Sequence, residues 1–340
     1  MYRALITASA LSLAATAAFA TTAAGSGQGS ASGSASAGGH RVEASGSIAV
    51  QLKGSFKPQV LQCASRPLDT EASPNRHPAL PFSSLEVLGL TTDGRLVCFH
   101  EALPGHVRVL ATVNGLQVDT QVLAIDHRAA DGALYGLGNA GGVYRIDPAT
   151  GVATLSNRLT VALQGTRVAA DFNPAADRLR IVTNTGQNLR HNVDAGGTTA
   201  TDAPLNYTAG TTASGVVAAA YINNDVSPAA APTNAAATAT ALFVIDANLD
   251  QVALQSPPNA GVLVATGKLQ QDVGEFTGFD IFSTVQGGVT TDNRALATTT
   301  AADGQTTLHS VNLLTGKLSA KGKLATGISL VDIAIPHGQR

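Results

Sequence analysis

The chain has 340 residues and a formal net charge of −2, from 21 Lys and Arg against 23 Asp and Glu. So small a net charge lacks the basic field that draws proteins onto nucleic acid or anionic lipid, and we expect neither partner. Only 13% of the residues are charged, and Ala, Gly, Ser and Thr are abundant. This composition favours tight turns and stacked sheets over a charged helical bundle.

Residues 1–20 are typical of a secretory signal peptide. Arg3 precedes an apolar run from Ala4 to Ala18, and Ala18-Phe19-Ala20 has the small residues of a cleavage site. No later stretch has the roughly 20 apolar residues that a transmembrane helix needs. We therefore expect an exported protein, periplasmic or extracellular, with no membrane insertion of the mature chain. A short N-terminal anchor that is never cleaved is the alternative.

Residues 21–81 form the next segment, an extension rich in Gly, Ser and Ala and then in Pro. From Thr21 to about Ser47 there is hardly a large side chain, so the segment buries too little apolar surface to offset its ordering entropy. This predicts a flexible linker. After it we expect a stray strand at Ser47–Leu52 and then irregular chain up to Pro81.

The mature chain contains two cysteines, Cys63 and Cys98. In an oxidising compartment the two can form a disulfide that ties the extension to the folded body. The alternative is two unpaired thiols, with Cys98 buried on a strand and Cys63 in a loop.

Residues 82–336 contain short runs rich in Val, Leu, Ile and Tyr, bounded by Gly, Asp, Asn or Pro, which indicate closely spaced strands. The runs repeat as units of four antiparallel strands with Asn-x-Gly-type turns, which tolerate the positive φ of tight hairpins. The units are Val122–Leu155, Val168–Ala200, Val216–Leu269 and Thr277–Leu324.

The two ends of this region complement each other. Glu86–Val113 matches the second to fourth strands of a unit, whereas Ser329–Pro336 matches a first strand alone. Pairing of the two ends would close the repeats into a ring without exposed sheet edges. The sequence thus predicts an all-β fold, a small β-propeller of five four-stranded blades closed by pairing of N- and C-terminal strands, with residues 337–340 as a tail. An open two-sheet sandwich is the alternative.

Three segments of this region resemble the family of bacterial exported proteins called domain of unknown function 4394. They are VLGLTTDGRLVCF (Val87–Phe99), GALYGLGNAGGVYRIDPATG (Gly132–Gly151) and the more specific DFNPAADRLRIVTNTGQNLR (Asp171–Arg190). The resemblance covers about Leu85–Pro336. This chain departs from the family pattern where RHNVDAGG replaces an Arg-x-Asn-Pro-Asp-x-x-Gly turn. The family brings no established activity, so the resemblance implies no catalytic residue.

Carboxylates recur at one position of the predicted first strands. Asp126, Asp171, Asp280 and Asp332 occupy it in four units, and Ala220 in the fifth. Because first strands lie innermost in a propeller, these side chains would face a common channel, where a hard cation such as Ca²⁺ would relieve their repulsion. The alternative is that each Asp accepts hydrogen bonds from the turn that follows it. We expect no other cofactor.

Arg178, Arg180 and Arg190 lie on adjacent predicted strands of one unit. Two of them can share a face and bind an anionic ligand bidentately. Exposed strand charges that pair with Asp177 or Asp194 explain them as well.

Other candidate motifs have structural interpretations. Gly136-x-Gly138-x-x-Gly141 has dinucleotide-binding spacing, but a strand rather than a helix follows it, so we interpret it as a hairpin turn. We expect His127 and His191 to be surface or turn residues rather than metal ligands.

These features favour an exported, monomeric, non-enzymatic module that binds an unknown ligand or a cell-envelope protein. One alternative is a glycosidase-like or lactonase-like hydrolase that uses the channel Asp residues. The absence of Trp weighs against it, because sugar sites stack rings on aromatic faces. The other alternative is a structural protein of the cell envelope or matrix.

Overall fold

The computed structural model describes residues 33–37, 40–44, 63, 84–224 and 239–339. The expected signal peptide of residues 1–20 and the stray strand at Ser47–Leu52 lie outside these residues. The chain divides into two compact units, Met1–Ser55 and Phe56–Arg340, which are described separately. Among the described residues, no helix is long and apolar enough to cross a membrane.

The first unit contains one antiparallel hairpin of β1 (Gly33–Ala37) and β2 (His40–Ala44). The flexible linker expected between Thr21 and Ser47 stays a prediction.

The second unit contains five four-stranded antiparallel sheets, the blades. From the innermost strand outward, blade 1 comprises β24 (Leu330–Ala334), β3 (Glu86–Thr91), β4 (Arg95–His100) and β5 (Leu103–Thr112). Blade 2 comprises β6 (Val122–His127), β7 (Leu134–Gly138), β8 (Gly142–Ile146) and β9 (Ala153–Arg158). Blade 3 comprises β10 (Val168–Asn173), β11 (Arg178–Thr183), β12 (Asn188–His191) and β13 (Thr199–Thr201).

The remaining two blades follow the same order. Blade 4 comprises β16 (Val216–Tyr221), β17 (Leu242–Asp246), β18 (Gln251–Gln255) and β19 (Leu263–Lys268). Blade 5 comprises β20 (Thr277–Gln286), β21 (Val289–Thr300), β22 (Thr306–Val311) and β23 (Leu318–Lys323). A small hairpin, β14 (Asn206–Thr208) with β15 (Thr211–Thr212), and the short 3₁₀ helix η1 (Pro258–Ala260) lie outside the blades.

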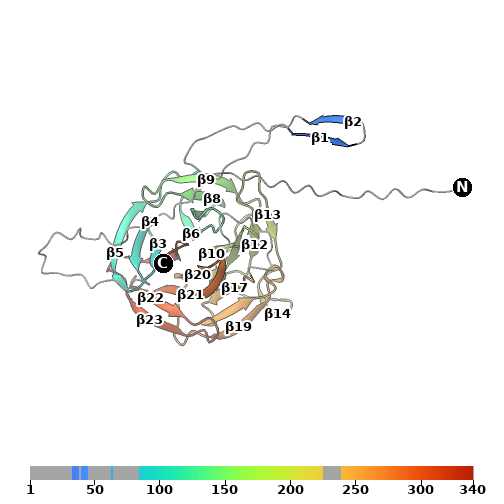
Figure 1. Ribbon diagram of the computed structural model, residues 1–340. Coiled ribbons are helices and arrows are strands. Elements are labelled where there is room, and N and C mark those ends of the chain that lie inside the picture. Colours follow the sequence, from blue (N-terminus) through green and yellow to red (C-terminus); the bar gives the residue numbers. More distant parts are fainter. Residues whose placement is uncertain (1–32, 38–39, 45–62, 64–83, 225–238, 340) are drawn as a thin grey trace, which may run out of the picture. The chain divides into compact units, whose positions relative to one another are not determined.

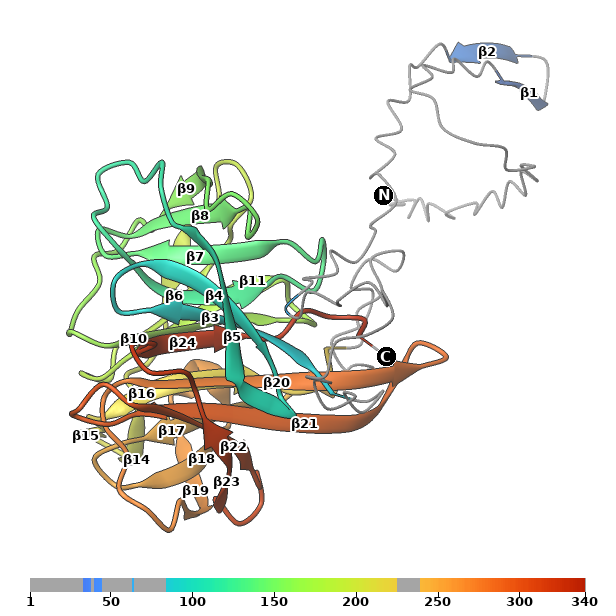
Figure 2. The same ribbon diagram turned by 90° about the vertical axis from the view of Figure 1, so that its left-hand side faces the viewer.

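The ring closes as the sequence predicted. β24, the last strand, pairs antiparallel with β3, the first strand of this unit, and places Ile333 opposite Gly89. Each innermost strand packs against the innermost strands of both neighbouring blades, in the cyclic order β24, β6, β10, β16, β20. Figure 1 views this arrangement from one end and Figure 2 from the side. The prediction of a five-bladed propeller is confirmed, and the open sandwich is excluded.

The predicted hairpin turns have the expected backbone conformation. Gly94, Gly141 and Gly186 occupy equivalent turns of blades 1, 2 and 3, and their φ angles are +79°, +85° and +84°. Glycine adopts these angles without a steric penalty. Of the glycines of the dinucleotide-like motif, Gly136 and Gly138 lie on β7 and only Gly141 lies in the turn, and the strand β8 follows, as expected.

Apolar side chains fill the spaces between neighbouring blades. Between blades 2 and 3, for example, Leu137, Phe172 and Ile181 belong to one buried cluster. The rings of Tyr135 and Phe172 meet edge to face there, with centroids 5.3 Å apart. Because each blade is covered on both faces, the inner strands and the side chains at their ends are fixed in place.

Cys63 and Cys98 form a disulfide in the structure. Cys98 is fully buried on β4, and Cys63 is 5% exposed. The backbone N–H of Cys63 donates to Oε1 of Glu86 at 3.3 Å. Residue 63 is thereby fixed to blade 1.

Candidate functional site

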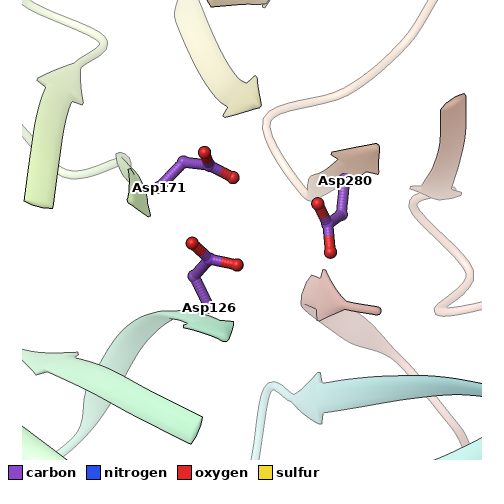
Figure 3. A group of neighbouring side chains, drawn as sticks. All are labelled: Asp126, Asp171 and Asp280. Atoms are coloured by element: carbon purple, nitrogen blue, oxygen red, sulfur yellow. The ribbon is translucent and has the colours of Figure 1, made fainter. Parts of the chain in front are cut away.

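The carboxyl groups predicted to face a channel lie on the innermost strands. Oxygens of Asp126, Asp171 and Asp280 approach within 4.8 Å of one another, and Figure 3 shows the three side chains converging from β6, β10 and β20. Asp332 occupies the corresponding place on β24. All four residues are buried, between 5 and 9% exposed.

Each of these carboxyls joins two blades. It accepts a hydrogen bond from a backbone amide on, or directly after, the innermost strand of a neighbouring blade. The pairs are Asp332 with Ile125 (2.9 Å), Asp126 with Phe172 (2.7 Å), Asp171 with Tyr221 (3.0 Å) and Asp280 with Ile335 (2.5 Å). Asp126, Asp280 and Asp332 also accept from the amide of the next residue on their own strand, at 2.6, 2.5 and 2.9 Å. All these amides lie on strands or directly after one, whereas those of an Asx-turn would lie in the turn that follows each Asp.

Other polar side chains serve the turn after β10 and the junction of blade 4 with blade 5. The turn after β10 is capped by Asn173, whose Oδ1 accepts from the amides of Ala175 and Ala176 at 2.9 Å. Blade 4 has Ala220 in place of Asp, and its junction with blade 5 uses other side chains instead. The N–H of Asn224, for example, donates to Oγ of Ser283 at 2.9 Å.

Burial controls the protonation of the carboxyl cluster. It raises the pKa of Asp280 to about 7. The pKa values of Asp126 and Asp171 lie well above the ordinary range, chiefly through burial and further through the charges of neighbouring Asp residues. Burial likewise raises the pKa of Asp332. The raised pKa values favour protonated carboxyls, which repel one another less than carboxylates do, and a cation at this place would compete with the bound protons.

The three predicted arginines share one face of blade 3. Arg178 and Arg180 are two residues apart on β11, so their side chains project to the same side. Arg180 is the register partner of Arg190 on β12, which places Arg190 beside it on that side. All three line a cavity of about 250 Å³, which we call the arginine cavity.

Arg180 forms the fixed floor of this cavity. Its side chain is only 2% exposed. Its N–H groups donate to Oδ1 of Asn188 (2.7 Å), Oδ2 of Asp202 (2.6 Å), Oδ1 of Asn259 (2.8 Å) and Oη of Tyr221 (3.4 Å). A buried guanidinium with this many acceptors is held in one orientation.

The other two arginines have fewer protein partners. Nε and Nη2 of Arg190 donate to the two carboxylate oxygens of Asp202 at 2.7 and 2.9 Å. Nη1 of Arg178 donates to the backbone carbonyls of Ala176 and Asp177 at 3.3 and 2.8 Å. Both side chains are partly exposed, so they can present N–H groups to a ligand.

The expected carboxylate partners of these arginines are instead bound elsewhere. Asp177 receives two hydrogen bonds from Arg128, at 2.7 and 2.5 Å, and Asp194 receives a third at 3.0 Å. The pairing of the three arginines with Asp177 or Asp194 is therefore wrong. Arg180 and Arg190 pair with Asp202, which sequence reasoning missed.

Blade 4 supplies the opposite wall of the arginine cavity. Tyr221 ends β16, and Pro257, Pro258 and Asn259 belong to the connection between β18 and β19. These residues lie far along the chain from Arg178. No local pattern in the sequence marks them as partners of the arginines, since only blade stacking brings them together.

A second cavity, of about 210 Å³, lies where the innermost strands begin. Its lining includes Val122, Val168 and Val217, at or near the starts of three of these strands. Within this lining the guanidinium of Arg167 lies 3.7 Å from the ring centroid of Phe276 and pairs with Glu275 at 3.3 Å. Neither cavity is lined by the four inner Asp residues.

His127 and His191 are not at the surface. They are 6% and 0% exposed, because both lie on strands covered by a neighbouring blade. Burial lowers the pKa of His127 to about 3 and that of His191 to about 4, so both rings are neutral at physiological pH. His191 is held by Asn157, with Nε2 2.8 Å from Oδ1.

Fold and site together define a class of protein, a five-bladed β-propeller with an arginine-lined cavity between two blades and a buried carboxyl cluster on its innermost strands. The family is also established. Residues 95–334 match the model of the domain of unknown function DUF4394, and the chain belongs to that family. No curated protein matches the sequence.

Several solved structures are distantly similar. A protein of unknown function from Bacteroides thetaiotaomicron is 14% identical, with a TM-score of 0.43 over 75% of this chain and 68% of that chain. An auxiliary nutrient binding protein from the same organism is 12% identical, with a TM-score of 0.39 over 68% and 56%. A protein from Lactobacillus plantarum is 14% identical, with a TM-score of 0.35 over 74% and 99%.

Proposed function

We propose that this chain is an exported binding module that holds a small anionic ligand in the arginine cavity. The observation that carries the proposal is the convergence of Arg178, Arg180 and Arg190 on one cavity. Guanidinium groups are permanently charged, planar donors that match the oxygens of carboxylates and phosphates. The signal-peptide pattern of the first twenty residues supports export.

The arginine cavity is preorganised for binding. Arg180 is held by side chains of its own blade and by Asn259 of blade 4, so little side-chain entropy remains to be lost on binding. Arg178 and Arg190 at the cavity provide the adjustable donors. One buried, fixed guanidinium beside two partly exposed ones suits selective recognition of an anion.

Binding without chemistry suits this geometry better than hydrolysis does. A hydrolase of the glycosidase or lactonase type needs a pair of accessible acid and base groups beside the substrate. The inner Asp residues are buried and bound to backbone amides, and the lining of the arginine cavity includes no carboxyl or imidazole. We therefore do not assign them to catalysis.

Isothermal titration calorimetry with acetate, succinate, inorganic phosphate and glycerol 3-phosphate tests the proposal. We expect at least one of these anions to bind, more weakly at high salt, and Arg178→Gln to reduce its affinity about tenfold or more. Arg145→Gln is the matched control, because Arg145 is an exposed strand arginine of blade 2 that does not line the cavity. Absence of binding by all four anions, or equal losses in both variants, would contradict the proposal.

A divalent cation at the inner Asp cluster is a second candidate. It is favoured by the approach of oxygens from Asp126, Asp171 and Asp280 to within 4.8 Å, since carboxylate oxygens are the ligands that Ca²⁺ prefers. At pH 8, where protons compete least, Ca²⁺ should raise the melting temperature of the wild type. It should not raise that of the double variant Asp171→Asn/Asp280→Asn. An identical response of both proteins to Ca²⁺ would eliminate the cation.

A further inference from the structure

We infer that the ligand of the arginine cavity is a phosphate monoester of a small hydroxylated molecule, an inference that rests on the proposed function. It starts from the charges at the cavity. Three guanidinium groups line it, and the one carboxylate bonded to them is that of Asp202. The contact shell therefore carries an excess of two positive charges.

The other carboxyls near the cavity do not bond to these three arginines. Asp177 and Asp194 share the single guanidinium of Arg128, and although this group keeps a net negative charge, none of its members lines the cavity. Asp171 is the register partner of Arg180 on β10, but burial raises its pKa and favours the neutral, protonated form. A ligand with two negative charges would balance the excess of two positive charges that the three arginines and Asp202 carry together.

The positive charges converge on one region instead of forming two separate sites. Nη1 of Arg180 and Nε of Arg190 reach the same oxygen of Asp202, at 2.6 and 2.7 Å. Arg178 projects from the same row as Arg180. Within the described part of the chain, Nε and Nη2 of Arg178 and Nη1 of Arg190 have no protein acceptor. Converging donors favour a doubly charged phosphate over a dicarboxylate with two separated charges.

The size and walls of the cavity indicate the rest of the ligand. Its volume of about 250 Å³ lies below the roughly 300–1,000 Å³ of sites for drug-sized molecules. Beside the arginines it offers the side-chain amides of Asn173 and Asn259, and the rings of Pro257 and Pro258. Amide groups hydrogen-bond hydroxyls, and proline rings cover a short carbon chain.

The decisive measurement compares methyl phosphate with methyl sulfate, which is nearly isosteric but carries one negative charge at every pH. The second ionisation of a phosphate monoester has a pKa near 6. We expect similar affinities for the two anions at pH 5 and an advantage of about tenfold or more for methyl phosphate at pH 8. Because methyl sulfate keeps one charge at every pH, the pH dependence of its own affinity reports any titration of protein groups such as Asp171.

The outcomes separate this inference from the proposed function. If both anions bind and depend on Arg178 but their ratio does not change with pH, the cavity binds anions and the assignment to a phosphate monoester is wrong. If neither anion, nor any of the four tested above, binds, the proposed function fails as well. Glycerol 3-phosphate should bind more tightly than methyl phosphate. Arg178-dependent cosedimentation with vesicles of phosphatidic acid would overturn the choice of a soluble ester.

Discussion

The inner carboxyl cluster predicts an unusual dependence of stability on pH, which Asp280→Asn tests. The pKa of Asp280 rises from 3.8 to about 7 on folding, because burial disfavours the charged form. The folded state then binds this proton more tightly than the unfolded state does. The stability contributed by the proton is fully present below pH 4 and is lost as the pH rises through about 7.

The magnitude follows from the two pKa values. A folded pKa of about 7 and an unfolded value of 3.8 make the folded state about 3 kcal/mol more stable at pH 5 than at pH 8 through this one residue. Asn is neutral at both pH values, so the variant lacks this change. Its amide also turns a donor toward the amide of Ile281 or Ile335, which costs about 1–3 kcal/mol at every pH.

Urea unfolding at pH 5, 6, 7 and 8, with a chelator present, measures the effect. The comparison of variant with wild type cancels the opposite contribution of His127, whose lowered pKa makes stability fall as the pH drops below 6.5. Asp303→Asn, in an exposed loop, is the control and should follow the wild type. Parallel pH profiles of wild type and Asp280→Asn would refute the assignment of a bound proton to this cluster.

Three further predictions concern stability. Arg180→Met leaves Asp202 paired with the partly exposed Arg190 alone and removes the donor to Asn188. It should lower the free energy of unfolding by about 1–3 kcal/mol in urea titrations, and an unchanged stability would show that these buried hydrogen bonds do not stabilise the fold. Gly94→Ala should cost about 1–2 kcal/mol from positive φ alone, whereas Gly186→Ala should cost more because its Cβ would clash with a neighbouring strand; equal losses in thermal melts would contradict this. Replacing Cys63 by Ser should cost about 2–5 kcal/mol, and wild type measured under reducing conditions should match it.

Much of the fold follows from local sequence patterns. Asn-x-Gly-type turns, which recur along the chain, determine where the hairpins form. The positive φ at Gly141 and Gly186 is sterically favourable only for residues such as glycine. The lone first strand near the C-terminus and the incomplete unit near residue 86 identify the closing pair. The turns depend on residues that are neighbours in the chain, and the closing pair is recognised from the repeat in the sequence.

The candidate site was predictable only in part. Alternation along a strand places Arg178 and Arg180 on one face, so the sequence could indicate a shared anion site. It could not show that Asp202 and Asn259 complete the cavity, because those residues come from a blade edge and from the neighbouring blade. It also placed His127 and His191 at the surface, since coverage of a strand by the next blade leaves no local signal.

The sequence by itself determined the repeat, the turns and the row of inner carboxyls, because each is a periodic pattern of residues along the chain. The tertiary structure decided what those carboxyls do. Only stacked blades bring the amide of Phe172 to Asp126, and only burial inside the ring raises the pKa of this carboxyl well above its usual range. Desolvation and contacts between blades depend on the closed ring, and no single segment of the chain encodes them.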